Sequence, residues 1–162
     1  MSNPAKPAAL PALSVPEVRG SGYPEPFKSR MGDRVKRRLG EAFGLTQFGV
    51  NLVVLGPGGQ SALRHWHLLE DEFMYLLEGE LVLVTNVGEQ VIRAGDCAGY
   101  QAGEPDGHHL INRSNAPARY LEIGSRNEGD VAFYPDDDLL LVPRVEDGKV
   151  ALHPAHKDGR AY

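Results

Sequence analysis

The sequence predicts an all-β fold, and two observations indicate it. Between residues 33 and 125, short apolar runs alternate with turn-forming Gly, Asn and Asp at intervals of roughly ten residues, as in a many-stranded β domain. No segment there sustains a helical period over three turns with a cap at each end. The turn signals include Gly56-Pro57-Gly58-Gly59, Glu78-Gly79-Glu80, Asn86-Val87-Gly88 and Ala94-Gly95-Asp96. The apolar runs between them span residues 45–55, 62–67, 72–77, 81–85, 90–93, 109–112 and 120–123.

The chain is predicted to form one domain with two distinct ends. Residues 27–151 are assigned to a β-barrel domain, since a chain of 162 residues suffices for one core. Residues 1–26 are rich in proline, which lacks a backbone N–H. We therefore expect an extended arm without helix or sheet, either disordered or lying across a neighbouring subunit. Residues 152–162 are predicted to be a frayed polar tail that follows a hairpin near residues 146–148.

Charge excludes some classes of partner. The chain has 17 Lys and Arg against 22 Asp and Glu, a formal net charge of −5, which argues against nucleic acid or an anionic membrane surface as the main partner. The only basic cluster, Lys36, Arg37 and Arg38 after Arg34, is predicted to be a solvated strand face. A phosphate-binding patch is the alternative.

Several other polar features are assigned no chemistry. Cys97 is the single cysteine and cannot form an internal disulfide, so we expect a small core residue in a reducing compartment. No apolar run in residues 1–26 is long enough for a signal peptide or a membrane span, which predicts a soluble cytoplasmic protein. The triplet at 136–138 is interpreted as a solvated loop, and His153 and His156 as surface residues.

Two predicted strands are apolar on both faces, which bears on assembly. They are Leu52–Leu55 and Leu81–Val84. A strand with one wet face would alternate apolar and polar residues, so something should cover the outer side. A second copy of the chain would supply that cover, and we therefore predict a homodimer. Cover by the chain's own terminal segments is the alternative.

A group of histidines and a glutamate suggests a metal site. His65 and His67 alternate along a predicted strand, so both imidazoles point to one face. A short turn would return the chain antiparallel, bringing the Glu72 carboxylate beside them. His108 or His109, after a Gly-rich loop, could add a third imidazole from a neighbouring strand.

These residues resemble the two motifs of the cupin superfamily. The first motif, G-x5-H-x-H-x3,4-E-x6-G, is matched at every fixed position by Gly59, His65, His67, Glu72 and Gly79. The second motif, G-x5-P-x-G-x2-H-x3-N, is matched at Gly95, Gly103, His108 and Asn112. In the second motif Gln101 replaces the proline and the Gly-to-His gap is four residues. With the flanking strands, the resemblance extends over about residues 33–143.

The resemblance implies a fold and a ligand set. It implies a double-stranded β-helix, or jelly-roll barrel, in which one divalent metal ion is held by three His and one Glu, in a dimer or larger assembly. Carried onto this sequence, the ligands are His65, His67, Glu72 and His108. His109 is the rival of His108, because the loop before it is longer than the motif's. Asp71 would replace Glu72 if the motif's shorter spacer applied.

Such a donor set limits the metal and the chemistry. Three imidazoles and a carboxylate suit Mn, Fe, Ni, Co, Cu or Zn, with positions open for water or substrate, although on Zn the four ligands could close a tetrahedral site. The chain also resembles small cupins labelled sugar-phosphate isomerases of the mannose-6-phosphate type. We therefore expect a metal-dependent isomerase or epimerase acting on a small polar, sugar-like substrate. The alternatives are an Fe- or Mn-dependent oxygenase and a non-catalytic metal- or sugar-binding module.

Strand parity predicts part of the pocket. Met74 and Leu76 should face inward with Glu72, and Phe73 and Tyr75 outward. Tyr100 is a candidate for the pocket mouth, either as a weak acid or as a structural hydroxyl. Arg64 and Arg113 should face outward, so no inward clamp for a phosphate group is predicted.

Overall fold

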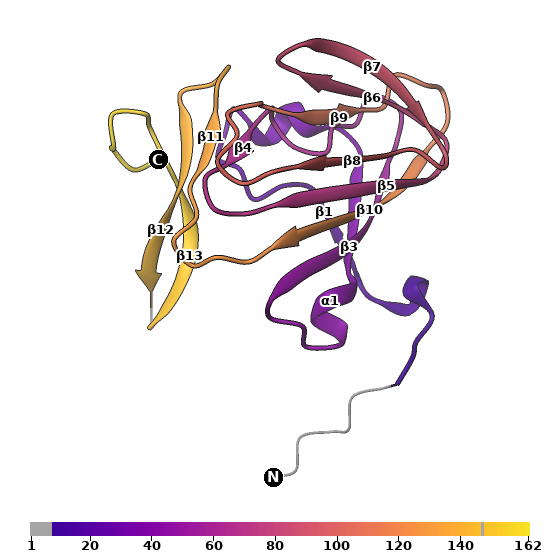
Figure 1. The fold of residues 1–162 in the computed structure, drawn as a ribbon, viewed down its shortest axis with the longest axis horizontal. Coiled ribbons are helices and arrows are strands. Elements are labelled where there is room, and N and C mark those ends of the chain that lie inside the picture. The colour runs from indigo at the N-terminus through magenta and orange to yellow at the C-terminus, as the bar shows by residue number, and fades with distance from the viewer. Residues whose placement is uncertain (1–7, 147) are drawn as a thin grey trace.

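The fold is a β-barrel flanked by a smaller sheet, as Figure 1 shows for the computed structural model, which describes residues 8–146 and 148–162. The six-stranded sheet has the order β1-β2-β3-β10-β5-β8, the four-stranded sheet β13-β12-β11-β4 and the three-stranded sheet β7-β6-β9. The strands are β1 (Glu17–Arg19), β2 (Arg34–Arg38), β3 (Phe48–Leu55), β4 (Trp66–His67), β5 (Glu72–Glu78), β6 (Glu80–Thr85), β7 (Gly88–Arg93), β8 (Cys97–Tyr100), β9 (His109–Ile111), β10 (Ala118–Ser125), β11 (Ala132–Tyr134), β12 (Leu139–Glu146) and β13 (Lys149–Ala155). The predicted all-β fold is confirmed.

Helical structure is minor in the described part of the chain. It consists of one α-helical turn, α1 (Leu39–Ala42), and two 3-10 turns at Ala12–Ser14 and Lys28–Met31. Each is far shorter than the span of a bilayer, and none is a candidate membrane helix.

The main core lies between the six-stranded and three-stranded sheets. Alternate residues of β3, β5 and β10 point inward and pack against β6, β7 and β9. As predicted, Met74 and Leu76 are buried, while Phe73 and Tyr75 are 41% and 39% exposed. Gly79, with φ +83°, makes the tight turn between β5 and β6, and a Cβ there would lie 3.0 Å from Ala118. The core members are Val53, Leu55, Met74, Leu76, Leu81, Leu83, Ile92, Leu110, Ala118 and Tyr120.

The N-terminal segment is more ordered than its proline content predicted. Glu17–Arg19 pairs antiparallel with β2 as strand β1, in register from Glu17↔Arg37 to Arg19↔Val35. The expectation of no sheet in residues 1–26 is therefore wrong at this strand. The reason is that residues 17–23, between Pro16 and Pro24, keep their N–H groups and can join a ladder. Residues 1–7, the start of the predicted arm, lie outside the described residues.

The C-terminal tail is docked and not frayed. The predicted hairpin is confirmed, because β12 and β13 pair from Glu146↔Lys149 to Leu140↔Ala155, with residue 147 at its turn outside the described residues. Beyond β13, Tyr162 donates its hydroxyl to the Asp138 carbonyl at 2.7 Å and stacks on His156 at 4.0 Å between ring centroids. Aromatic stacking and a hydrogen bond hold this polar tail, which composition alone did not reveal.

Cys97 is exposed, so its assignment to the core is wrong. It begins β8, an edge strand of the six-stranded sheet, and pairs with Tyr75, whose side chain also faces outward. Paired residues of neighbouring strands share a face, and Ala98, the next residue, packs against the core instead. The parity of β8 was not readable from four residues of mixed character.

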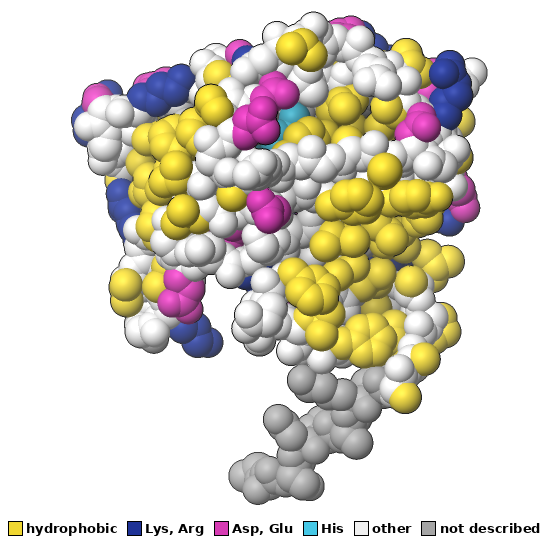
Figure 2. Space-filling model, viewed as in Figure 1, with side chains coloured by type: hydrophobic (Ala, Val, Ile, Leu, Met, Phe, Trp, Pro, Cys, Tyr) yellow, Lys and Arg dark blue, Asp and Glu magenta, His cyan; other side chains and the backbone are white. Residues whose placement is uncertain are grey.

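The strands with two apolar faces are covered within the single chain. Leu52 and Val82, the residues expected to need cover, are 5% and 8% exposed. A different apolar surface remains open on the six-stranded sheet and beside it, seen as the large yellow area in Figure 2 over β5 and its neighbours. We call it the outer patch. Its exposed members include Leu45, Phe48, Phe73, Tyr75 and Leu77.

The homodimer stays a prediction, now based on the outer patch. Contiguous exposed apolar surface of this kind is typical of subunit interfaces. We expect the wild-type chain to have twice its 17.7 kDa mass in light scattering after gel filtration, and the Phe73→Lys/Tyr75→Lys variant to have the single mass. Val87→Lys is the matched control, because Val87 is 96% exposed in the turn after β6. A wild type of single mass would remove the prediction.

Candidate metal centre

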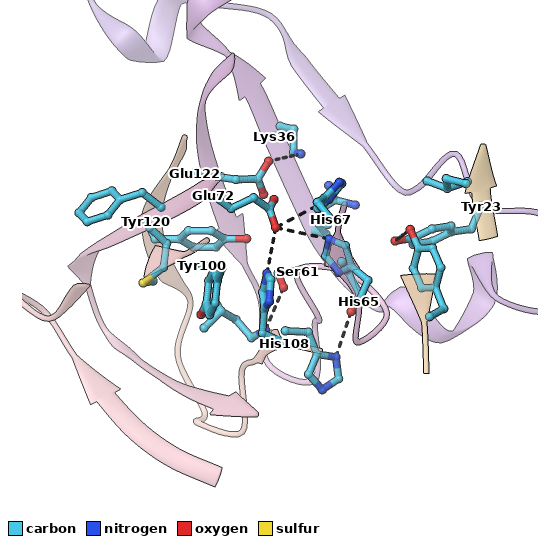
Figure 3. A pocket seen from close by; sticks show the side chains of 18 residues that line it. Tyr23, Lys36, Ser61, His65, His67, Glu72, Tyr100, His108, Tyr120 and Glu122 are labelled. Carbon is cyan, nitrogen blue, oxygen red and sulfur yellow. Dashed lines mark hydrogen bonds and ion pairs between the residues drawn. The ribbon is translucent and has the colours of Figure 1, made fainter. Parts of the chain in front are cut away.

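The four predicted ligands meet at one point in the structure. Figure 3 shows Glu72 with dashed lines to the three imidazoles. Glu72 Oε2 lies 2.9 Å from His108 Nε2, 3.7 Å from His65 Nε2 and 3.8 Å from His67 Nε2. His65, His67 and Glu72 also form a compact group with the spacing of metal ligands. Histidines 65 and 67 thus share a face, as strand parity predicts.

Two different sheets bring these side chains together. His67 ends β4, which pairs with β11 of the four-stranded sheet, whereas Glu72 begins β5 of the six-stranded sheet. His65 and His108 form an isolated antiparallel bridge, just before β4 and β9. Their backbones exchange two hydrogen bonds, of 3.2 and 2.9 Å. The site therefore lies at the junction of the two sheets.

Each imidazole is oriented by a hydrogen bond at its other nitrogen. The acceptors of Nδ1 are the Leu63 carbonyl for His65 at 2.8 Å, Asp130 Oδ2 for His67 at 2.5 Å and the Asp106 carbonyl for His108 at 3.1 Å. Because these oxygens can only accept, Nδ1 carries the hydrogen, and a neutral ring then presents its Nε2 lone pair to Glu72. All three rings are thus prepared to be ligands through Nε2.

The electrostatics of the site favour a cation between these groups. Burial opposes ionisation of Glu72, but the hydrogen bond from His108 and the charges of His65 and His67 hold its pKa at about 2. Burial lowers the pKa of His65 to about 4, so that ring is neutral near pH 7. A carboxylate and neutral Nε2 lone pairs that face one another repel unless a proton or a metal ion lies between them. The donors present therefore fit a divalent ion.

The two rival ligands are engaged elsewhere. His109 Nδ1 lies 3.1 Å from the Ala62 carbonyl, and this ring lines the cavity without contacting Glu72. Asp71 accepts a hydrogen bond from the Ala102 amide at 2.8 Å. His108 and Glu72 are thus the residues of each pair that reach the cluster.

The centre opens into a cavity of about 230 Å³ inside the barrel. Tyr100 lines this cavity and stacks on His108, with ring centroids 3.4 Å apart and the planes 1° from parallel. Its hydroxyl is buried without a hydrogen-bond partner in the described residues, and burial raises the pKa of Tyr100. Tyr100 therefore supplies a neutral O–H group at the cavity wall. Gln101, the other mouth candidate, does not line the cavity.

Asp130 is a site residue that sequence reasoning missed. Its fully buried carboxylate accepts from His67 Nδ1 and, at 2.9 Å, from the Leu69 amide. Burial opposes a charge on His67, but the hydrogen bond to Asp130 outweighs it and raises the pKa of that ring. The predicted pattern held no signal for Asp130, because it lies in a polar stretch that resembles a loop.

The interpretation of the basic cluster as a solvated face is wrong for Arg34 and Lys36. Both line the cavity, because Arg34 pairs with Leu55 and Lys36 with Val53, and these partners face the core. Lys36 Nζ contacts Glu122 Oε1 at 2.6 Å, as Figure 3 shows. Burial opposes ionisation of Glu122, but Lys36 outweighs it and lowers the pKa of this carboxyl group. A charged residue within the apolar run 120–123 was the available signal.

The remaining polar clusters lie away from the cavity. The residues of the acidic triplet pair with Arg64, Arg30 and His156 in turn, and His153 lies near Glu146. Arg64 also bonds the Gly107 carbonyl at 3.3 Å and does not line the cavity, as predicted.

Comparison with known proteins assigns the family. The Cupin domain family matches residues 51–124. A solved structure from Silicibacter pomeroyi, named sugar phosphate isomerase from a cupin superfamily, is 42% identical, covers 95% of this chain and 96% of its own, and has a TM-score of 0.86. The chain belongs to the cupin superfamily. The polyketide cyclase RemF from Streptomyces resistomycificus, 20% identical with a TM-score of 0.57 over 72% of this cupin and 78% of its own chain, shares the fold.

One curated relative matches this cupin over part of its length. The tetracenomycin polyketide synthase protein TcmJ from Streptomyces glaucescens is 37% identical over 78 residues, which are 48% of this cupin and 50% of TcmJ. This cupin thus spans half the length of that relative. The predicted jelly-roll barrel is confirmed by these comparisons together with the nearly all-β structure.

Proposed function

We propose that this cupin binds one divalent metal ion through His65, His67, Glu72 and His108 and acts on a small polar substrate as an isomerase or epimerase. The observation that carries the proposal is the convergence of three Nε2 atoms on one Glu72 oxygen, each ring held from behind at Nδ1. The donor set accepts Mn, Fe, Ni, Co, Cu or Zn. When bound, such an ion supplies Lewis acidity that polarises a carbonyl or hydroxyl oxygen.

The chain's own residues supply the rest of the chemistry. An isomerisation moves a proton between adjacent carbons, which requires a base within reach. Glu122 is an ionised carboxylate that lines the same cavity, and Lys36 and the Asn51 amide, at 2.6 and 3.0 Å, hold its Oε1 in place. We assign it the role of proton acceptor through its other oxygen. Tyr100, kept neutral, donates a hydrogen bond to a substrate oxygen.

The choice of substrate class has support from one relative. The Silicibacter pomeroyi protein, similar to this cupin over almost the whole chain, has sugar phosphate isomerase as its printed name. A cavity of about 230 Å³ with polar groups on its wall suits a molecule of a few carbons. We therefore propose a sugar or sugar phosphate as substrate.

The proposal is tested by isotope exchange in the absence of oxygen. Metal-loaded protein is incubated anaerobically in D₂O with aldose and ketose phosphates of five and six carbons, and the products are observed by proton NMR. Isomerisation through a base places deuterium on the carbon beside the carbonyl group. We expect this exchange with wild type and its loss in Glu122→Gln.

Two outcomes would contradict the isomerase. Substrate loss that requires air and consumes O₂, without deuterium incorporation, would identify an oxygenase. Saturable sugar binding without any turnover would identify a binding module. The Arg113→Gln variant is the control, because Arg113 pairs with Glu89 on an exposed surface outside the cavity.

A further inference from the structure

A row of cationic side chains leads from the metal cavity to the rim of the barrel. On β2, residues two apart share a face, so Arg34, Lys36 and Arg38 point the same way. Arg34 and Lys36 line the metal cavity, and all three line a second cavity of about 460 Å³ between β2 and the segment around β1. The two cavities therefore adjoin at Arg34 and Lys36.

The second cavity is strongly basic. Among the described residues, five cationic side chains line it and one carboxylate, that of Glu41, does so. The cationic members are Arg19, Arg34, Lys36, Arg38 and Arg126. In a chain whose net charge is −5, this concentration of positive charge in one hollow creates a local potential that attracts anions.

Existing ion pairs leave part of this charge uncompensated. Glu41 is shared by Arg38 at 3.3 Å and Arg126 at 3.8 Å. Lys36 is paired with Glu122, and Arg19 shares Glu17 with Arg37, an arginine outside the cavity. Even if Glu17 neutralised Arg19 fully, two positive charges would remain in the hollow.

Arg34 has no carboxylate partner within ion-pair distance among the described residues, and its Nε is a buried donor without a hydrogen bond. A buried donor left without a partner costs free energy, which an acceptor on a ligand would recover. Tyr120, whose hydroxyl is also buried and without a partner, lines the metal cavity together with Arg34. Unpartnered donors thus gather at the place where the two cavities adjoin.

We propose that this basic hollow binds the phosphate group of a phosphorylated substrate while the rest of that substrate enters the metal cavity. The inference rests on the proposed function for its catalytic part, but the anion site stands on its own residues. A phosphate monoester carries a charge of about −1.5 to −2 and three acceptor oxygens, which match two uncompensated cations and several donors. A carboxylate carries one charge and would leave one cation unmatched.

The test measures phosphate binding without the metal. Inorganic phosphate is titrated by calorimetry into the whole protein after the metal has been removed by chelation, so that no ion can bind phosphate directly. We expect saturable binding that weakens at high ionic strength. Arg34→Gln should weaken it by roughly tenfold or more, the effect of losing a charge-assisted hydrogen bond. Arg126→Gln, at the rim, should weaken it less.

Controls separate this proposal from that of the metal enzyme. Arg113→Gln, remote from the hollow, should bind phosphate as wild type does, and circular dichroism of each variant establishes that it is folded. The His65→Ala/His67→Ala variant should keep phosphate binding. Absence of saturable binding, equal affinity in folded Arg34→Gln and wild type, or acetate binding as tightly as phosphate would each overturn the phosphate site. Failure of the metal ligands to bind metal would overturn only the proposed function.

Discussion

The His65→Ala/His67→Ala variant is expected to lose stoichiometric metal binding while keeping its β fold. Two of the four proposed donors disappear, and the remaining pair, Glu72 and His108, cannot hold a divalent ion firmly in competition with water. Both histidines lie at the edge of the core clusters, and neither belongs to them, so the packed interior is unchanged. Elemental analysis of purified protein gives the metal content per chain, and circular dichroism gives the fold.

A matched variant makes this result specific. His153→Ala/His156→Ala removes two histidines of nearly the same spacing that do not line the cavity. This control should keep the metal content of wild type. Equal metal in wild type and in His65→Ala/His67→Ala would refute the proposed centre.

Asp130→Asn is expected to lower metal affinity by about 10- to 100-fold, the usual cost of losing the partner of a ligand histidine. The amide has the size of the carboxylate and can still accept from the Leu69 N–H. It carries no charge, however, and its NH₂ group can face His67 Nδ1 only if the ring moves its hydrogen to Nε2. Nε2 would then no longer offer a lone pair to a metal ion.

Chelator competition measures the dissociation constant of this variant against wild type. Asp137→Asn serves as the matched control, because Asp137 pairs with Arg30 at 2.5 Å far from the imidazoles. A structural role alone would change the melting temperature of Asp130→Asn without changing metal affinity. Unchanged affinity would therefore show that Asp130 does not position His67.

The proposed ligands could be read from the sequence because short-range geometry determines most of their arrangement. Strand alternation places His65 and His67 on one face, and a four-residue connection returns the chain to Glu72. His108 needed the spacing of a known motif, since nothing local places β9 beside β4.

Residues that depend on long-range closure of the barrel could not be read. Arg34 and Lys36 alternate with Val35 and Arg37, so either face of β2 could have been the inner one. Only the register with β3 shows which face lies against the core. Asp130 reaches His67 across 63 positions, a contact that β11 creates by pairing with β4. Local pattern carries no information about such distant partners.

The placement of the ligands at the junction of two sheets has a consequence for folding. His67 is anchored to β4 and, through Asp130, to the segment leading into β11, whereas Glu72 belongs to the opposite sheet. Coordination bonds to both would cross-link the barrel wall to the C-terminal hairpin layer. The free energy of binding would then be shared with unfolding, since an unfolded chain lacks the preformed cluster. Metal supply would set not only turnover but also the lifetime of the folded chain.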